Sequence, residues 1–136
     1  MDQYWIIYKP EELESEIEKC PITKESLVGL CSNNIIKVKI FYFENPESKG
    51  LTMYGGCEEG IPRYYIYINK SRPYKEKIKT FAHEIAHVHY HCGGTSFDKK
   101  NGSIVERIIE REAMNAIKTY PALFKSAFRK IAQGLI

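Results

Sequence analysis

The sequence predicts a small α+β domain, in which a short antiparallel or mixed three-stranded sheet packs on a helix that is followed by further helices. Two observations support this class: strand-like apolar and aromatic stretches gather between residues 35 and 69, and helical periodicity dominates after residue 74. With 136 residues and 43% hydrophobic composition, the chain can bury one core without disulfides, so we expect residues 1–136 to form a single domain.

Three strands are expected in the first half. Residues 35–43 alternate apolar side chains with lysines before both faces become apolar, as strands do. Residues 51–54 and 63–69 are predicted to be short strands joined by a loop rich in glycine and proline, and residues 64–68 carry the strongest strand signal. The three strands would form a small meander before the long helix.

Four helices are expected. Residues 10–19 begin with proline and carry acids in the first turn. A second helix should run from Tyr74 to about His91 and end at Gly93–Gly94, which can adopt a left-handed cap. After a polar loop, Ser103 can cap a helix to about Thr119, and Pro121 then separates a last amphipathic helix. One face of that last helix should pack in the core: Leu123, Phe124, Ala127, Phe128, Ile131 and Ala132.

Net charge, cysteine spacing and the first ten residues argue against several classes of function. A formal charge of +3 is too small to indicate a dedicated nucleic-acid binder, so no direct nucleic-acid binding is expected. The four cysteines form no C-x-x-C pair, which favours reduced thiols over a cysteine zinc site. The first ten residues show neither a basic leader nor a long apolar stretch, so we expect a cytoplasmic protein without membrane attachment.

The segment His83-Glu84-Ile85-Ala86-His87 is the strongest chemical signal in the chain. Two histidines four residues apart on a helix project from one face, where both can bind one tetrahedral zinc ion. A glutamate beside the first histidine can reach a metal-bound water and accept its proton. We therefore predict Zn²⁺ held by His83 and His87, with Glu84 as general base.

Two further histidines follow this segment. His89 lies six residues after His83 and points to another side of the helix, which favours a solvated or hydrogen-bonded role. His91 is about 12 Å along the helix axis from His83, so both can hardly bind one ion. His91 is expected to be a helix-terminal residue or a partner of a ligand, and a metal role for it stays open.

The order of several segments resembles the ImmA/IrrE family of metallopeptidases. That family has a strand ending in Ile-Asn, an Arg-Pro turn, the H-E-x-x-H helix and a later helix with an E-x-x-A-N motif. The similar segments here are Ile68-Asn69, Arg72-Pro73, Thr80–His87 and Val105–Ala113. The resemblance covers roughly residues 64–121, and Met114 stands where the family has Asn.

The resemblance implies a zincin-like fold and a zinc-dependent endopeptidase that hydrolyses a peptide bond in a protein substrate. In characterised relatives the substrate is a helix-turn-helix repressor of phage, mobile-element or stress-response genes. An edge strand of the sheet would pair with the extended substrate, and residues 64–69 or a neighbouring strand would serve. Tyr65, Tyr67 and Asn69 are therefore candidate substrate-binding residues.

The third metal ligand is expected among Glu106, Glu110 and Glu112. The helical pattern places Glu112 within the apolar arc, where a carboxylate must be paired, and places Glu110 at its border. A border position suits a catalytic zinc that keeps one coordination position open. The family motif also selects Glu110, because Ala113 follows it by three residues. Glu110 is the preferred ligand, with Glu112 and Glu106 as alternatives.

Two other functions compete with the peptidase. A non-cleaving module could keep the zinc site and bind a repressor without cutting it. An SprT-like nucleic-acid-associated protease would need a third histidine after the motif helix, and none occurs beyond His91.

Overall fold

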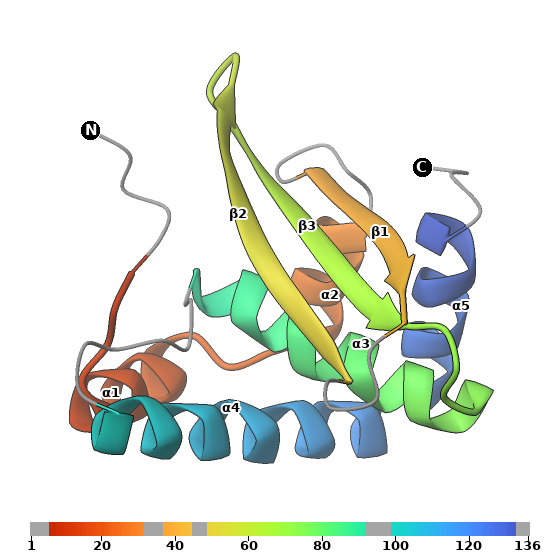
Figure 1. Cartoon of the computed structure of the whole chain (residues 1–136). Coiled ribbons are helices and arrows are strands. Elements are labelled where there is room, and N and C mark those ends of the chain that lie inside the picture. Colours follow the sequence, from red (N-terminus) through yellow and green to blue (C-terminus); the bar gives the residue numbers. More distant parts are fainter. Residues whose placement is uncertain (1–5, 32–36, 45–48, 92–98, 133–136) are drawn as a thin grey trace.

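The computed structural model describes residues 6–31, 37–44, 49–91 and 99–132. Within them it contains five helices and one three-stranded mixed sheet, so the predicted α+β class is confirmed. The elements are α1 (Pro10–Lys19), α2 (Lys24–Cys31), β1 (Lys37–Phe43), β2 (Gly50–Glu58), β3 (Ile61–Asn69), α3 (Tyr74–Tyr90), α4 (Lys99–Thr119) and α5 (Pro121–Ala132). Helix α3 lies between the sheet and α4, and α5 flanks β1 (Figure 1).

The sheet is not the predicted meander. Its strand order is β1-β3-β2, with β3 parallel to β1 and antiparallel to β2. Because β3 is central and paired on both sides, residues 64–69 cannot offer a free edge to a substrate strand. The outer edges belong to β1 and β2, so only the alternative of a neighbouring strand remains.

The hairpin between β2 and β3 is tighter than expected, because both strands extend into the predicted loop. Glu59 and Gly60 both have positive φ, 53° and 79°, which is the backbone of a two-residue hairpin turn. The glycines absorb an irregularity in register between Tyr54 and Cys57, where Gly56 has φ 82°. Glycine and proline here shape a continuous hairpin rather than a loop.

The core lies between the sheet, α3 and the flanking helices. On β3, alternate residues are buried, as a strand with one covered face requires. Phe81 of α3 packs edge-on against two rings of α5, with centroid distances of 6.3 Å to Phe124 and 5.3 Å to Phe128. The predicted core face of α5 is confirmed for Phe124, Ala127, Phe128 and Ile131, while Leu123 and Ala132 are partly buried.

Helix ends account for most differences from expectation. Helix α1 has the predicted limits, but α2 was not predicted; it begins where Thr23 and Ser26 exchange side-chain-to-backbone hydrogen bonds of 2.8 and 3.1 Å. Helix α4 starts at Lys99, so Ser103 lies inside it instead of capping it. Helix α3 ends in a left-handed residue as expected, but that residue is His91 (φ 52°); Gly93–Gly94 lie outside the described residues.

Residues before α1 donate hydrogen bonds to the carbonyl groups at the C-terminal end of α3. The backbone N–H of Ile6 donates to the carbonyl of His91 (2.6 Å), and the Tyr8 hydroxyl donates to the carbonyl of Tyr90 (3.2 Å). The last carbonyls of a helix have no partner within the helix. Residues from the start of the chain therefore supply donors to the helix that carries the H-E-x-x-H segment.

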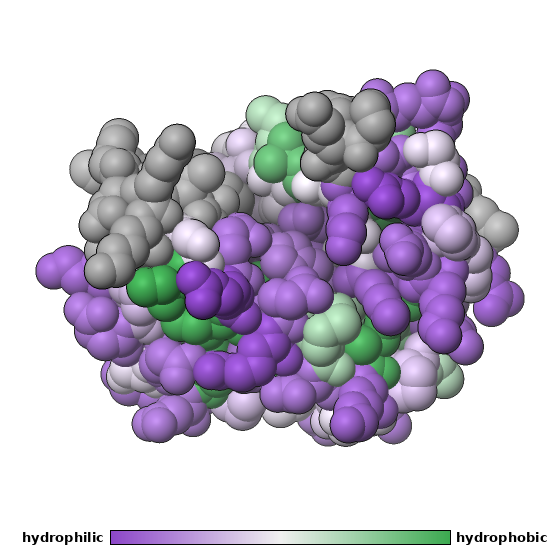
Figure 2. Space-filling model, turned by 60° about the horizontal axis from the view of Figure 1, so that its bottom comes forward, coloured by the Kyte–Doolittle hydropathy of each residue, from purple (hydrophilic) through white to green (hydrophobic). Residues whose placement is uncertain are grey.

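The face on the α4 side is largely hydrophilic, with small hydrophobic areas between polar ones (Figure 2). Among the helices that the structure describes, none is both long enough and apolar enough to cross a membrane.

Candidate metal centre

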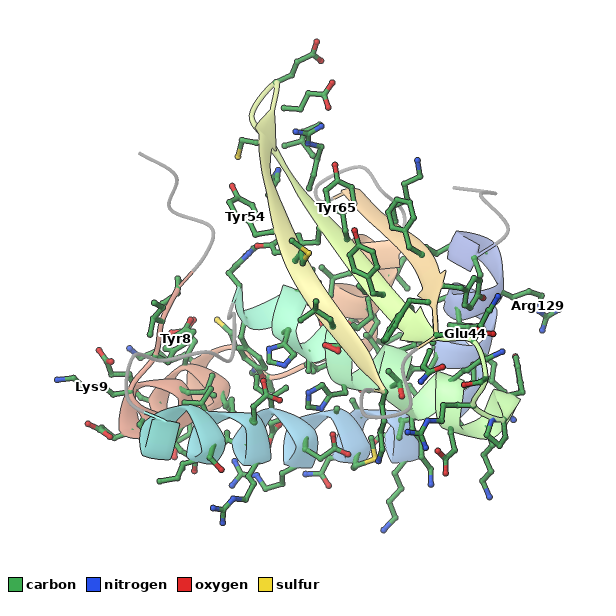
Figure 3. All side chains as sticks on the ribbon, viewed as in Figure 1. Tyr8, Lys9, Glu44, Tyr54, Tyr65 and Arg129 are labelled. Carbon is green, nitrogen blue, oxygen red and sulfur yellow. The ribbon has the colours of Figure 1, made fainter. Side chains whose placement is uncertain are left out.

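Helix α3 brings His83, Glu84 and His87 together. Their potential ligand atoms all lie within 4.8 Å of one another. Glu84 and His87 are each only 4% exposed, whereas His83 is partly exposed. Side chains of α3 and α4 project into the space between the two helices (Figure 3). The predicted motif thus forms a compact, largely buried group of donors capable of holding a metal ion.

Strand β2 holds the Glu84 carboxylate from the sheet side. The Thr52 hydroxyl donates to Oε1 of Glu84 at 3.0 Å, and Thr52 is itself buried. The backbone of β2 also approaches this carboxylate, since a Cβ added to Gly50 would lie 3.6 Å from Oε2 of Glu84. Burial raises the pKa of Glu84, although the two histidines and the Thr52 hydrogen bond act in the opposite direction. The carboxylate therefore has a fixed orientation and a raised affinity for a proton.

Glu106 of α4 faces both motif histidines. Its Oε2 lies 3.0 Å from Nε2 of His83, and its Oε1 lies 3.0 Å from Nε2 of His87. Burial would raise the pKa of Glu106, but hydrogen bonds from the two rings outweigh it and lower the pKa to about 2. Glu106 therefore stays ionised beside the histidine pair.

Glu110 lies one helical turn further along α4 and contacts the other nitrogen of the same ring. Its Oε2 is paired with Nδ1 of His83. Burial tends to lower the pKa of His83, but Glu106 and Glu84 outweigh that effect and the pKa is raised. Two carboxylates four residues apart on α4 thus face the two motif histidines on α3, because residues at this spacing lie on the same face of a helix.

The donor set fits a zinc ion. The Nε2 atoms of His83 and His87 are 3.1 Å apart. Two nitrogens bound to one tetrahedral zinc at about 2.0–2.1 Å each lie roughly 3.3 Å apart. Imidazole nitrogens with a nearby carboxylate are also ligands that zinc prefers. The residues present therefore match the predicted metal in both chemistry and spacing.

The remaining candidates for metal binding lie elsewhere. Glu112 is partly buried and accepts from Nε of Arg111 at 3.3 Å. Its charge adds to burial in raising the pKa of Tyr90. His89 contacts the carbonyl of Cys20 through Nε2 (2.9 Å), in agreement with a hydrogen-bonded role. His91 caps α3, and its Nδ1 lies 2.6 Å from the Tyr64 hydroxyl.

The three candidate substrate-binding residues are not brought to the metal group. Tyr65 and Tyr67 alternate with the buried residues of β3 and lie on the opposite face of the sheet, where both rings contact Phe41. Figure 3 shows Tyr54 and Tyr65 on the half of the hairpin away from α4. Asn69 is fully buried, and its Oδ1 accepts from the backbone N–H and the hydroxyl of Ser71. Asn69 therefore shapes the turn before α3.

Sequence reasoning missed Thr52, because a lone threonine on a predicted strand carries no signal of its own. Its role depends on the packing of β2 over α3, which places residues 32 positions apart in hydrogen-bond contact. The resemblance to a family motif selects Glu110, whereas in the structure Glu106 is a carboxylate that contacts both Nε2 atoms.

Comparison with known proteins agrees with this geometry. The family model for the IrrE N-terminal-like domain, Peptidase_M78, matches residues 33–128, which is more than half of the chain. Searches of curated proteins and of solved structures returned no match. The family match spans the sheet, the H-E-x-x-H helix and the helix bearing Glu106 and Glu110. The chain belongs to the ImmA/IrrE family of metallopeptidases.

Proposed function

We propose that this chain is a zinc-dependent endopeptidase that hydrolyses a peptide bond in a protein substrate. The observation that carries the proposal is the convergence of the two Nε2 atoms of His83 and His87, 3.1 Å apart, beside the buried carboxylate of Glu84. A zinc ion at this position would polarise the scissile carbonyl and lower the pKa of a bound water. The family match supports the same chemistry.

Glu84 is suited to proton transfer. It lies beside the first histidine and is buried, and Thr52 fixes its orientation at 3.0 Å. Burial raises its pKa, which brings a carboxylate closer to the value at which it can both accept and return a proton near neutral pH. We assign Glu84 the role of general base towards water and then of acid towards the departing amine.

The outer edge of β2 is the preferred place for an extended substrate. Strand β2 is an edge of the sheet, and its first residues, Gly50 to Thr52, lie against α3 beside Glu84. Unpaired backbone groups on an edge accept a peptide as an added strand. This edge replaces Tyr65, Tyr67 and Asn69 as the proposed substrate-binding element.

The substrate that we propose is a helix-turn-helix repressor in the cytoplasm, on the basis of the family match. The test uses Glu84→Gln as a trap, because this variant should keep its fold and zinc but lose cleavage. A repressor that co-purifies with Glu84→Gln should be cut by the wild type and left intact by the variant, with fragments identified by mass spectrometry. If zinc-loaded wild type binds the repressor and leaves it whole, the chain is instead a non-cleaving binding module.

A further inference from the structure

We infer that the outer face of the sheet, which points away from α3, is a docking surface for an acidic amphipathic helix of a partner protein. This outer face is formed by outward residues of the three strands: Lys39, Phe41, Leu51, Met53, Tyr65 and Tyr67. Thr52, which contacts Glu84, lies on the other face of the same sheet. The inference therefore concerns a surface separate from the metal centre and does not rest on the proposed function.

The strand register gathers these side chains into two rows across the sheet. Each row takes one residue from every strand: Lys39, Tyr65 and Met53 in one row, and Phe41, Tyr67 and Leu51 in the other. Side chains of paired residues lie on the same face and contact one another. The ring centroid of Phe41 lies 5.8 Å from that of Tyr65 and 5.3 Å from that of Tyr67. The rows thus form one continuous surface of aromatic and apolar groups.

This surface is exposed although its composition suits a covered sheet. Leu51 is 52% exposed, Met53 48% and Phe41 38%. In Figure 1 the strands lie in front of α2 and α3, and none of the helices drawn there covers their near face. Strand β3 carries apolar or aromatic residues on both faces, as strands do when helices pack on either side. The helices that the structure describes supply one of these layers, and a partner helix would supply the other.

The charges around the outer face select an acidic partner. Two exposed lysines flank it, Lys39 on β1 and Lys49 immediately before β2. The sequences of the three strands contain one carboxylate, Glu58, which is paired with Arg63 at 2.9 Å. Acidic side chains beside the apolar stripe of a helix would meet the lysines, whereas basic ones would be repelled by them.

The same contacts argue against two other occupants. Single-stranded nucleic acid binds by stacking its bases on open aromatic faces. Here the ring of Phe41 is stacked on Tyr67, and Nζ of Lys39 lies 5.6 Å from its centroid, while Leu51 and Met53 are more exposed than this ring. A second copy of the chain would place the same lysines and apolar groups opposite each other, without the acids that the lysines require. An acidic helix matches the outer face in both respects.

The test measures the binding of two synthetic helical peptides to the full chain by fluorescence anisotropy. Both peptides have leucines along one face; the flanks carry glutamates in one and lysines in the other. At low salt the acidic peptide should bind at least about tenfold more tightly than the basic one, and added salt should reduce the difference.

Variants then locate the binding surface. Leu51→Thr/Met53→Thr should weaken binding of the acidic peptide by about 10–30-fold, because two half-exposed apolar side chains are lost. The matched control is Ile7→Thr/Val28→Thr, whose residues lie outside the sheet and are 52% and 50% exposed. This control should bind within about twofold of the wild type. Lys39→Glu should weaken the acidic peptide and strengthen the basic one, each by about two- to fivefold.

Several results would overturn the inference. These are equal affinity for the two peptides, no binding of either, or equal losses in the test and control variants. Binding of an oligo(dT) strand that is lost in Leu51→Thr/Met53→Thr would assign the outer face to nucleic acid instead. A wild-type dimer in sedimentation velocity that this variant abolishes would assign it to a second copy. If the double variant does not fold, Lys39→Glu decides, and an unchanged preference between the peptides contradicts the inference.

Discussion

Replacing Thr52 by valine tests whether the sheet holds the general base. The two side chains have similar shapes, so the change removes chiefly the hydroxyl, which donates to Oε1 of Glu84 at 3.0 Å and lies at a longer 3.4 Å from the Glu84 carbonyl. Both residues are buried, with exposures of 7% for Thr52 and 4% for Glu84, so water cannot easily replace the lost donor. A hydrogen bond to a charged group contributes about 1.5–3 kcal/mol. The added methyl group offsets about 0.8 kcal/mol of this loss, so Thr52→Val should destabilise the fold by about 1–2 kcal/mol.

The assay is a double-mutant cycle measured by urea unfolding at neutral pH with a chelator present, so that metal binding does not contribute. Thr52→Val is measured in the wild type and in Glu84→Ala. In Glu84→Ala the cost should become a gain of about 0.8 kcal/mol, because only the added methyl group still acts, giving a coupling energy of about 1.5–3 kcal/mol. Equal costs in both backgrounds, within the roughly 0.5 kcal/mol typical of independent sites, would show that Thr52 does not hold Glu84.

Three further substitutions, and Gly29→Ala as a control for the first, test other contacts of the fold. Gly50→Ala should destabilise the fold by about 1–3 kcal/mol, because its Cβ would lie 2.8 Å from a backbone oxygen of β3. Gly29→Ala has open space around its Cβ and should stabilise helix α2 by about 0.5–1 kcal/mol. The midpoints of urea unfolding compare the two variants. Tyr64→Phe removes the hydroxyl that contacts Nδ1 of His91 and should cost about 0.5–1.5 kcal/mol in the same measurement, so an unchanged midpoint would contradict that contact. Burial lowers the pKa of His89, so the folded state resists protonation of this ring. The stability that the neutral ring contributes is therefore present above the unfolded pKa near 6.5 and is lost as the pH falls through the lowered folded pKa. Metal-free His89→Gln should accordingly lose less stability than the metal-free wild type between pH 7.5 and 5.5.

The parts of the fold that follow local rules could be predicted from the sequence. Helix α1 begins at a proline and carries acids in its first turn, and the structure gives it the predicted limits. Helix α3 differs from its prediction by a single residue at the end, because the motif residues lie within a strongly periodic segment. Both predictions depend on interactions between residues close together in the chain.

The parts that depend on distant pairing could not be predicted. Whether β1 joins the sheet beside β2 or beside β3 depends on packing with distant elements, here α5 and α2, and both arrangements suit the same alternation of residues. The start of α2 carried a usable signal in the Thr23 and Ser26 pair, which was not recognised. For the metal centre, spacing identified His83 and His87, but the rotation of α4 against α3 determines which carboxylate meets them.

The contacts of Ile6 and Tyr8 with the end of α3 bear on where this domain begins. The family match starts at residue 33, yet donors that close the H-E-x-x-H helix come from residues 6 and 8, and Leu13 of α1 is fully buried. A fragment cut at the limits of the family match would expose apolar surface and leave helix carbonyls without these donors. The minimal unit for expression, for crystallisation or for transplanting the site into another protein therefore extends to the first residues that the structure describes. In this chain, residues before the family boundary therefore help to support the C-terminal end of the H-E-x-x-H helix.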